Sequence, residues 1–248
     1  MLGRGAIAGL VVASLCALPA AAAEPVEFAH GKLENTFTAT RPNAPTGTSY
    51  SGTYHAAGDP GADPPYMRRM VFYPPAGMRY DTGVPERCTA SDLQLQLQLE
   101  GASACPEGSR LGGGTARGKA FGSETTLQID VFNNTGEQVM VVRSPMVASV
   151  SRGRFRPDGS IEFASPTCYP ALVTCPADNA LQLGSDVTSP PYTRGGRAYL
   201  TTPPKCPKSG RWRSTVRFWW ADGTEDTVAS THPCKRPAAK KAKRKRRR

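Results

Sequence analysis

The ten residues from Arg211 to Trp220 alternate strictly between two kinds of side chain, and no other feature constrains the fold as tightly. Successive side chains of a β-strand point to opposite faces of a sheet. One face would carry Trp212, Ser214, Val216, Phe218 and Trp220, and the other Arg211, Arg213, Thr215, Arg217 and Trp219. This pattern predicts a strand with an aromatic core face and a cationic solvent face. Asp222-Gly223 then forms a hairpin turn, and Thr227–Ser230 returns as the partner strand.

The rest of the chain also predicts short strands, because Gly and Pro together make up 48 of its 248 residues and interrupt every long run. The other expected strands are 26–32, 69–73, 126–132, 139–142, 146–150, 161–163 and 198–201. Short strands separated by turns are typical of an all-β protein. We therefore expect an antiparallel β-sandwich, Ig-like or jelly-roll-like, with at most one or two short helices. Residues 66–234 would form the β-rich domain, preceded by a strand and an irregular segment over 24–65.

One segment carries two conflicting signals. Residues 93–99 read LQLQLQL, and strict alternation of this kind favours a half-buried strand. Leu and Gln are also good helix formers, however, and Ser91 and Asp92 stand where an N-cap is expected. A short helix or turn is the preferred prediction, because Cys88 and Cys105 flank the segment and Pro106 follows closely.

The N-terminal residues 1–23 have the pattern of a secretory signal peptide. Arg4 gives a positive start, an apolar run of about thirteen residues follows, and small residues at 20–23 would form a cleavage site before Glu24. The apolar run is shorter than the roughly 20 residues that a membrane-spanning helix needs. We expect a secreted protein without a transmembrane span after cleavage.

The cysteines support export. Cys16 would leave with the signal peptide, and six cysteines would remain, an even number that fits three disulfides in an oxidising compartment. These six are Cys88, Cys105, Cys168, Cys175, Cys206 and Cys234. Neighbours in sequence suggest the pairs Cys88–Cys105, Cys168–Cys175 and Cys206–Cys234, although six cysteines allow 15 pairings. No C-x-x-C pair is present, so we expect no metal site.

The net charge of +11 is concentrated at the C-terminus. Removing Arg4 and the ten cations of residues 235–248 from the 31 Lys and Arg leaves 20, which equals the 20 Asp and Glu. The tail cations are Lys235, Arg236, Lys240, Lys241, Lys243, Arg244, Lys245, Arg246, Arg247 and Arg248. We therefore expect a neutral body with a disordered polybasic tail. Such a tail would bind an anionic cell-wall polymer, lipid headgroups or, without sequence preference, nucleic acid.

A surface site is predicted on the solvent face of the Arg211–Trp220 strand. If Trp220 is in the core, Trp219 must project outward near Arg217 and Arg213. An exposed Trp can stack on a sugar ring or a partner, and an adjacent Arg can hold its ring by a cation–π contact. An ordinary packed aromatic residue is the alternative.

Catalytic and cofactor motifs are weak. Residues 113–120, GGTARGKA, resemble a phosphate-binding loop but lack the Ser or Thr required after Lys119. A turn that leads into a strand is the preferred prediction for them. There is no G-x-S-x-G, and His30, His55 and His232 stand outside any motif, so surface or structural roles are expected for them. We expect no cofactor and no catalytic residue. A secreted hydrolase acting on envelope polysaccharide remains the alternative, since paired carboxylates are brought together only by the fold. Glu225 and Asp226, beside the Asp222-Gly223 turn, are expected to be solvated hairpin residues.

Several segments resemble a known but uncharacterised protein family. They are PERC ending at Cys88, ACPEGSRLGGG from Ala104, RSPMVAS from Arg143, and the stretch from Lys205 to Cys234. The resemblance is to secreted proteins of high-GC Gram-positive, actinobacterial bacteria. It implies an export signal, a β-rich extracellular body and paired cysteines, and it implies no activity. The expected function is therefore a non-catalytic, envelope-associated binding protein that its basic tail holds to anionic polymers.

Overall fold

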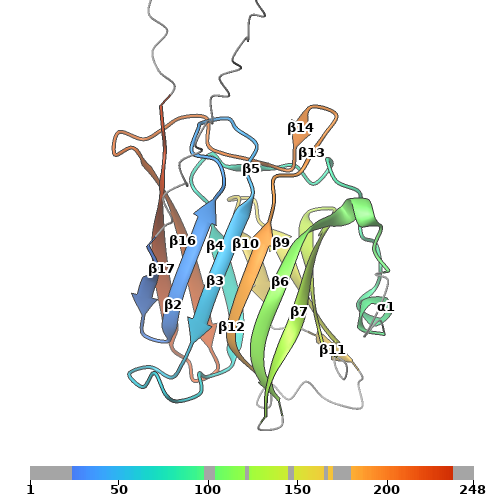
Figure 1. Cartoon of the computed structure of the whole chain (residues 1–248), viewed down its shortest axis with the longest axis vertical. Helices are drawn as coiled ribbons and strands as arrows, with labels where there is room; N and C mark the ends of the chain where they lie inside the picture. Colours follow the sequence, from blue (N-terminus) through green and yellow to red (C-terminus); the bar gives the residue numbers. More distant parts are fainter. Residues whose placement is uncertain are drawn as a thin grey trace, which may run out of the picture.

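The computed structural model describes residues 24–97, 104–120, 123–144, 148–164, 167–169 and 180–236. One antiparallel sheet dominates this part of the chain (Figure 1). Its strands, in spatial order, are β1 (Val26–Phe28), β2 (Gly31–Phe37), β3 (Thr48–Tyr54), β12 (Ala180–Ser189), β6 (Arg110–Ala120), β7 (Ser123–Asn134), β8 (Glu137–Arg143), β9 (Ala148–Phe155), β10 (Ile161–Ala164), β4 (Met67–Tyr73), β16 (Arg211–Trp220) and β17 (Glu225–Pro233). A further strand, β11 (Thr167–Tyr169), pairs with β9. The all-β antiparallel prediction is confirmed.

The two layers of the fold are halves of this single sheet. In Figure 1, β2, β3, β12 and β6 form the near layer, and β4, β10 and β9 lie behind them. The sheet curves until β17 lies beside β1 and β2, so its first and last strands meet. Phe28 of β1 stacks on Phe218 of β16 with ring centroids 5.4 Å apart. The fold is therefore nearly closed on itself, and its core fills the space between the layers.

The core follows from the alternation of the strands. On β16, Trp212, Ser214, Val216, Phe218 and Trp220 are all buried, as predicted. Phe218 and Trp220 pack with Leu33 and Tyr54 from β2 and β3. Further along the sheet, Leu111, Ile129 and Val131 of β6 and β7 pack beneath Tyr199 and Leu200.

Strands β7 to β9 are covered on their outer face as well. Val139 and Val141 of β8 are fully buried there, against Phe132 and Leu95. Leu95 comes from α1 (Asp92–Gln96), which confirms the short helix predicted over this part of 93–99. Ser91 caps the helix, and Gln94 completes a capping box. The Cys88–Cys105 disulfide joins the two ends of the segment that contains α1.

Two expectations need correction, and one strand was missed. Residues 24–65 do not form one strand and an irregular segment, because β1, β2 and β3 place them inside the main sheet. The Gly-rich segment 113–120 lies within strand β6 rather than forming a turn that leads into a strand. Its glycines allow close approach to β12, since a Cβ at Gly114 would lie 1.8 Å from the Asp186 carbonyl oxygen. The missed strand is β12 itself, which has ten residues and which the sequence pattern did not predict.

Smaller elements complete the fold at the end where β16 begins. They are the pairs β13 (Thr193–Arg194) with β14 (Arg197–Ala198) and β15 (Leu200–Thr201) with β5 (Arg79–Tyr80), and the 3₁₀ helix η1 (Glu107–Ser109). Several turns contain a Gly with positive φ, among them three hairpin turns of the main sheet. They are Gly136 between β7 and β8 (φ 69°), Gly159 between β9 and β10 (φ 82°) and Gly223 between β16 and β17 (φ 87°).

Candidate functional site

The tail leaves the folded body from a fixed point. Strand β17 ends at Pro233, and the next residue, Cys234, forms a disulfide with Cys206. The Cys234 amide donates to the Gly210 carbonyl oxygen at 2.8 Å, and the Lys235 amide donates to the Thr40 carbonyl oxygen at 2.7 Å. Lys235 and Arg236 are exposed. The remaining predicted tail residues, Lys240, Lys241, Lys243, Arg244, Lys245, Arg246, Arg247 and Arg248, lie outside the described residues.

Two of the predicted disulfides are confirmed, Cys88–Cys105 and Cys206–Cys234. The third predicted pair, Cys168–Cys175, lies outside the described residues, because Cys175 and the Cys168 side chain are not among them. Disulfides form and persist in oxidising compartments and are rare in the cytosol. The two bonds therefore indicate an oxidising, extracellular type of environment.

Trp219 projects from the outer face of β16 and is half-buried between two arginines. The Arg69 guanidinium carbon lies 3.6 Å from the centroid of the Trp219 ring, and that of Arg217 lies 4.9 Å from it. The predicted contact with Arg217 is therefore present. Arg213 is exposed further along β16, where it pairs with Thr231 and makes no described contact with the Trp219 ring.

The sequence did not reveal the role of Arg69. It stands opposite Trp219 only because β4 and β16 pair in this register, although they are far apart in the chain. Its guanidinium covers the indole at contact distance and occupies the surface on which a sugar ring would stack. The geometry thus favours the alternative weighed above, a packed cross-strand aromatic residue.

The arginines around Trp219 are also paired with carboxylates. Arg217 Nη2 lies 3.0 Å from Glu225 Oε2, and Arg69 Nη1 lies 3.7 Å from Glu162 Oε1. Glu162 also pairs with Arg156. The two arginines that contact Trp219 therefore have counter-charges of their own.

His30 belongs to a buried polar cluster where the last hairpin meets the β1–β2 turn. Its Nδ1 lies 2.6 Å from Asp226 Oδ2, and Trp220 Nε1 donates to the same oxygen at 2.8 Å. On the other side of the ring, Nε2 lies 3.4 Å from Thr224 Oγ1. The Thr224 hydroxyl in turn donates to Asp222 Oδ1 at 2.6 Å.

Thr224, His30 and Asp226 contact one another in the order of a catalytic triad, with a hydroxyl, an imidazole and an orienting carboxylate. The imidazole is only 2 % exposed, however, and the hydroxyl is engaged by Asp222. The cluster joins β1–β2 to β16–β17 and has a structural role. Asp226 was expected to be a solvated hairpin residue, which is wrong. Its alternation with buried Val228, Ser230 and His232 is the signal that would have placed it inside.

A second buried histidine, His232, lies near the C-terminal end of β17. Its Nε2 is 2.7 Å from Ser214 Oγ, and its ring packs edge-on against Phe37 with centroids 4.4 Å apart. Burial, with a smaller contribution from the Arg211 charge, lowers the pKa of His232 to about 4. Ser214 and His232 are each 2 % exposed. A serine–imidazole contact can activate a nucleophile, but this one is enclosed in the core.

The described part of the chain holds no group of three or more His, Cys, Asp or Glu side chains that could bind a metal ion. Within the same residues, no helix has the length and apolar character needed to cross a lipid bilayer. The chain shows no match to any protein-family model, curated protein or solved structure.

Proposed function

We propose that this protein is secreted, non-catalytic and β-rich, and that its basic tail holds it to anionic polymers of the cell envelope. The observation that carries the proposal is the tail itself, with ten cations and no acid in the last fourteen residues. It begins one residue after a cysteine that is bonded to the body through Cys206. A force on the tail is thereby transmitted to the folded sheet. The actinobacterial origin and the signal peptide at 1–23 belong to this proposal.

The magnitude of the tail contribution supports retention. Near an anionic surface each Lys or Arg contributes about 1 kcal/mol, so half of the tail cations would contribute about 5 kcal/mol. The tail contains no apolar residue larger than Ala apart from its single Pro, so it has nothing to insert into a bilayer. Binding would be electrostatic and reversible by salt.

The alternative, a hydrolase of envelope polysaccharide, requires two carboxylates facing a shared substrate. The carboxylates near Trp219 are already committed. Glu162 is shared by Arg69 and Arg156, and Asp226 is enclosed with His30 and Trp220. We therefore prefer the binding function.

Cell fractionation tests the proposal. The full chain should stay with the envelope in low salt and should be released by about 1 M salt, where charges are screened over roughly 3 Å. A variant with the ten cations of 235–248 replaced by Gln keeps the length of the tail and should appear in the medium. Equal envelope retention of this variant and the parent would contradict the proposal.

A further inference from the structure

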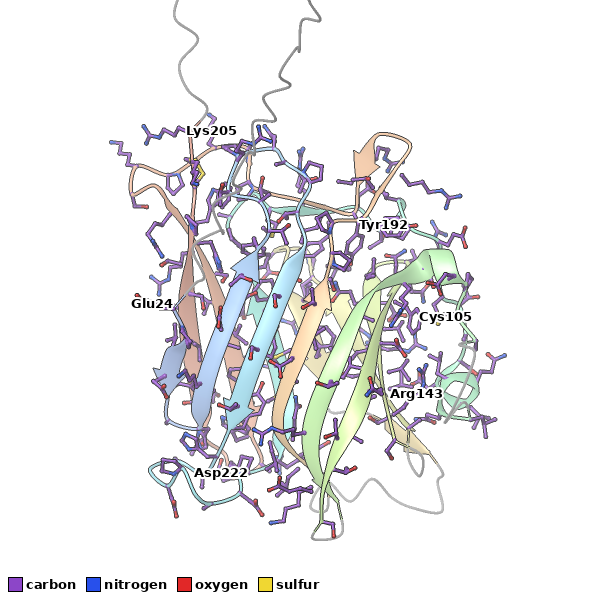
Figure 2. The ribbon with its side chains drawn as sticks, viewed as in Figure 1. Glu24, Cys105, Arg143, Tyr192, Lys205 and Asp222 are labelled. Atoms are coloured by element: carbon purple, nitrogen blue, oxygen red, sulfur yellow. A yellow bond between two sulfur atoms is a disulfide. The ribbon has the colours of Figure 1, made fainter. Side chains whose placement is uncertain are left out.

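Six exposed cations gather at the end of the body from which the tail leaves. They come from three segments, residues 38–47, 202–211 and 233–236, and we call them the tail-end platform. The platform consists of Arg41, Lys205, Lys208, Arg211, Lys235 and Arg236. Figure 2 shows Lys205 at this end of the molecule and Asp222 at the opposite end.

The backbone of the platform is held in place by buried contacts. The Thr202 side chain is fully buried, and its hydroxyl donates to the Arg41 carbonyl oxygen at 2.7 Å. The buried indole of Trp212 donates to the Lys205 carbonyl oxygen at 3.0 Å. The Cys206–Cys234 disulfide and the hydrogen bond from the Lys235 amide to the Thr40 carbonyl oxygen connect all three segments. The cations are thus presented by a fixed scaffold, which lowers the ordering cost of binding.

The charge of the platform is not compensated locally. None of its three segments contains Asp or Glu, and none of its six cations forms an ion pair with a described residue. Arg152, by contrast, forms ion pairs with both Asp92 and Glu137. Unpaired, exposed cations side by side are an electrostatic footprint for a polyanion.

The opposite end of the sheet carries acidic groups. Asp59 and Asp63 lie in the β3–β4 loop, and Asp222 and Glu225 lie at the β16–β17 turn. Basic and acidic residues balance over 24–234, so the net charge of the body does not set its orientation. The platform cations and the tail lie at one end of the body, and that end would approach an anionic layer first.

We propose that the tail-end platform is a folded phosphate-binding surface that seats the body end-on on a phosphate-rich cell-surface polymer, with the acidic end directed away. This inference rests on the proposed function, because the tail supplies the first attachment. The platform segments contain no aromatic residue. Proteins that bind single-stranded nucleic acid without sequence preference stack bases on aromatic side chains, so a phosphate polymer without bases fits the surface better.

The test compares two variants of equal charge in the full chain, both with the tail intact. The platform variant carries Arg41→Gln, Lys205→Gln and Lys208→Gln. Arg211 is left unchanged because its guanidinium also bonds to Thr231. The control variant carries Lys32→Gln, Arg117→Gln and Arg154→Gln, three exposed cations on strands β2, β6 and β9. Matched thermal unfolding would establish that both variants are folded.

The probes are immobilised poly(glycerol phosphate) and, separately, single-stranded poly-dT. Each phosphate-contacting cation contributes about one unit to the slope of log affinity against log salt. Each also contributes about fivefold to affinity near an anionic surface. The platform variant should lose about a hundredfold in affinity for poly(glycerol phosphate), and its salt slope should be smaller by about two to three units. The control variant should stay within about threefold of the parent.

Equal losses in the two variants would overturn the inference while leaving attachment by the tail intact. Tighter binding to poly-dT than to poly(glycerol phosphate) at the same salt would overturn the choice of partner. Failure of the proposed function has a different signature. Replacing the eight tail cations of 240–248 by Gln leaves Lys235 and Arg236 of the platform unchanged, and it would then leave the affinity of the chain unaffected.

Discussion

At the scale of single residues, the core of this protein contains more polar side chains than the alternation of its strands predicts. His232, Ser214 and Asn35 are all buried, and Asn35 Nδ2 donates to Ser214 Oγ at 3.5 Å while the hydroxyl contacts His232 at 2.7 Å. Such groups must be hydrogen-bonded to be tolerated in a core. They complete the contact between β2 and the last hairpin, and they couple stability to pH.

The depressed pKa of His232 predicts an acid-sensitive stability. In the folded state the pKa is about 4, and in the unfolded chain it is near the ordinary value of 6.5. Between these values the unfolded chain binds the proton and the folded one does not, so the free energy of unfolding falls as the pH falls from about 6.5 to about 4. The contribution is at most about 3 kcal/mol.

Urea denaturation at about pH 7 and about pH 4.5 measures this dependence. His232→Gln removes the imidazole, and its free energy of unfolding should vary less with pH than that of the parent, although its stability at neutral pH is reduced. The same pH dependence in both proteins would assign the effect to other groups.

At the scale of elements, closure of the sheet depends on contacts between its first and last strands. Asp226 on β17 accepts from Trp220 and contacts His30 of the β1–β2 turn. Removing one partner of a buried pair leaves the other unsatisfied, which costs about 3 kcal/mol. Asp226→Ala should lower the free energy of unfolding by about this amount.

The adjacent residue provides the control. Glu225 is exposed and pairs only with Arg217 among the described residues. Glu225→Ala should change the free energy of unfolding by no more than about 0.5 kcal/mol. Thermal or urea unfolding of the two variants compares these losses of stability. Similar small effects in both would show that the His30–Asp226 contact does not hold the two hairpins together.

The elements that sequence predicted well are those whose signals are local. The β16–β17 hairpin follows from strict alternation with Asp222-Gly223 between its arms, and α1 follows from the Ser91 cap. Strand β6 was not foreseen, because Gly is disfavoured in strands and becomes favourable here only through the close approach of β12. The stack of Arg69 on Trp219 was missed for a related reason, since it requires the long-range pairing of β4 with β16.

At the scale of the whole molecule, six exposed cations gather at one end of the sheet. Sequence composition predicts a neutral body with a separate basic tail. Composition does not reveal that Arg41, Lys205 and Lys208 lie at the same end as Lys235. Three loops far apart in the chain meet there because antiparallel strands return alternate connections to the same end. The candidate surface is thus a property of topology.

The central claim is that the tail-bearing end of the sheet is the anion-binding end. Hydrogen–deuterium exchange of the full chain, free and bound to poly(glycerol phosphate), tests it without any substitution. Backbone amides of residues 38–47 and 202–211 should gain protection on binding, whereas those of the β3–β4 loop and of residues 221–224 at the acidic end should not. Protection confined to the acidic end or to the outer faces of the strands would contradict the account.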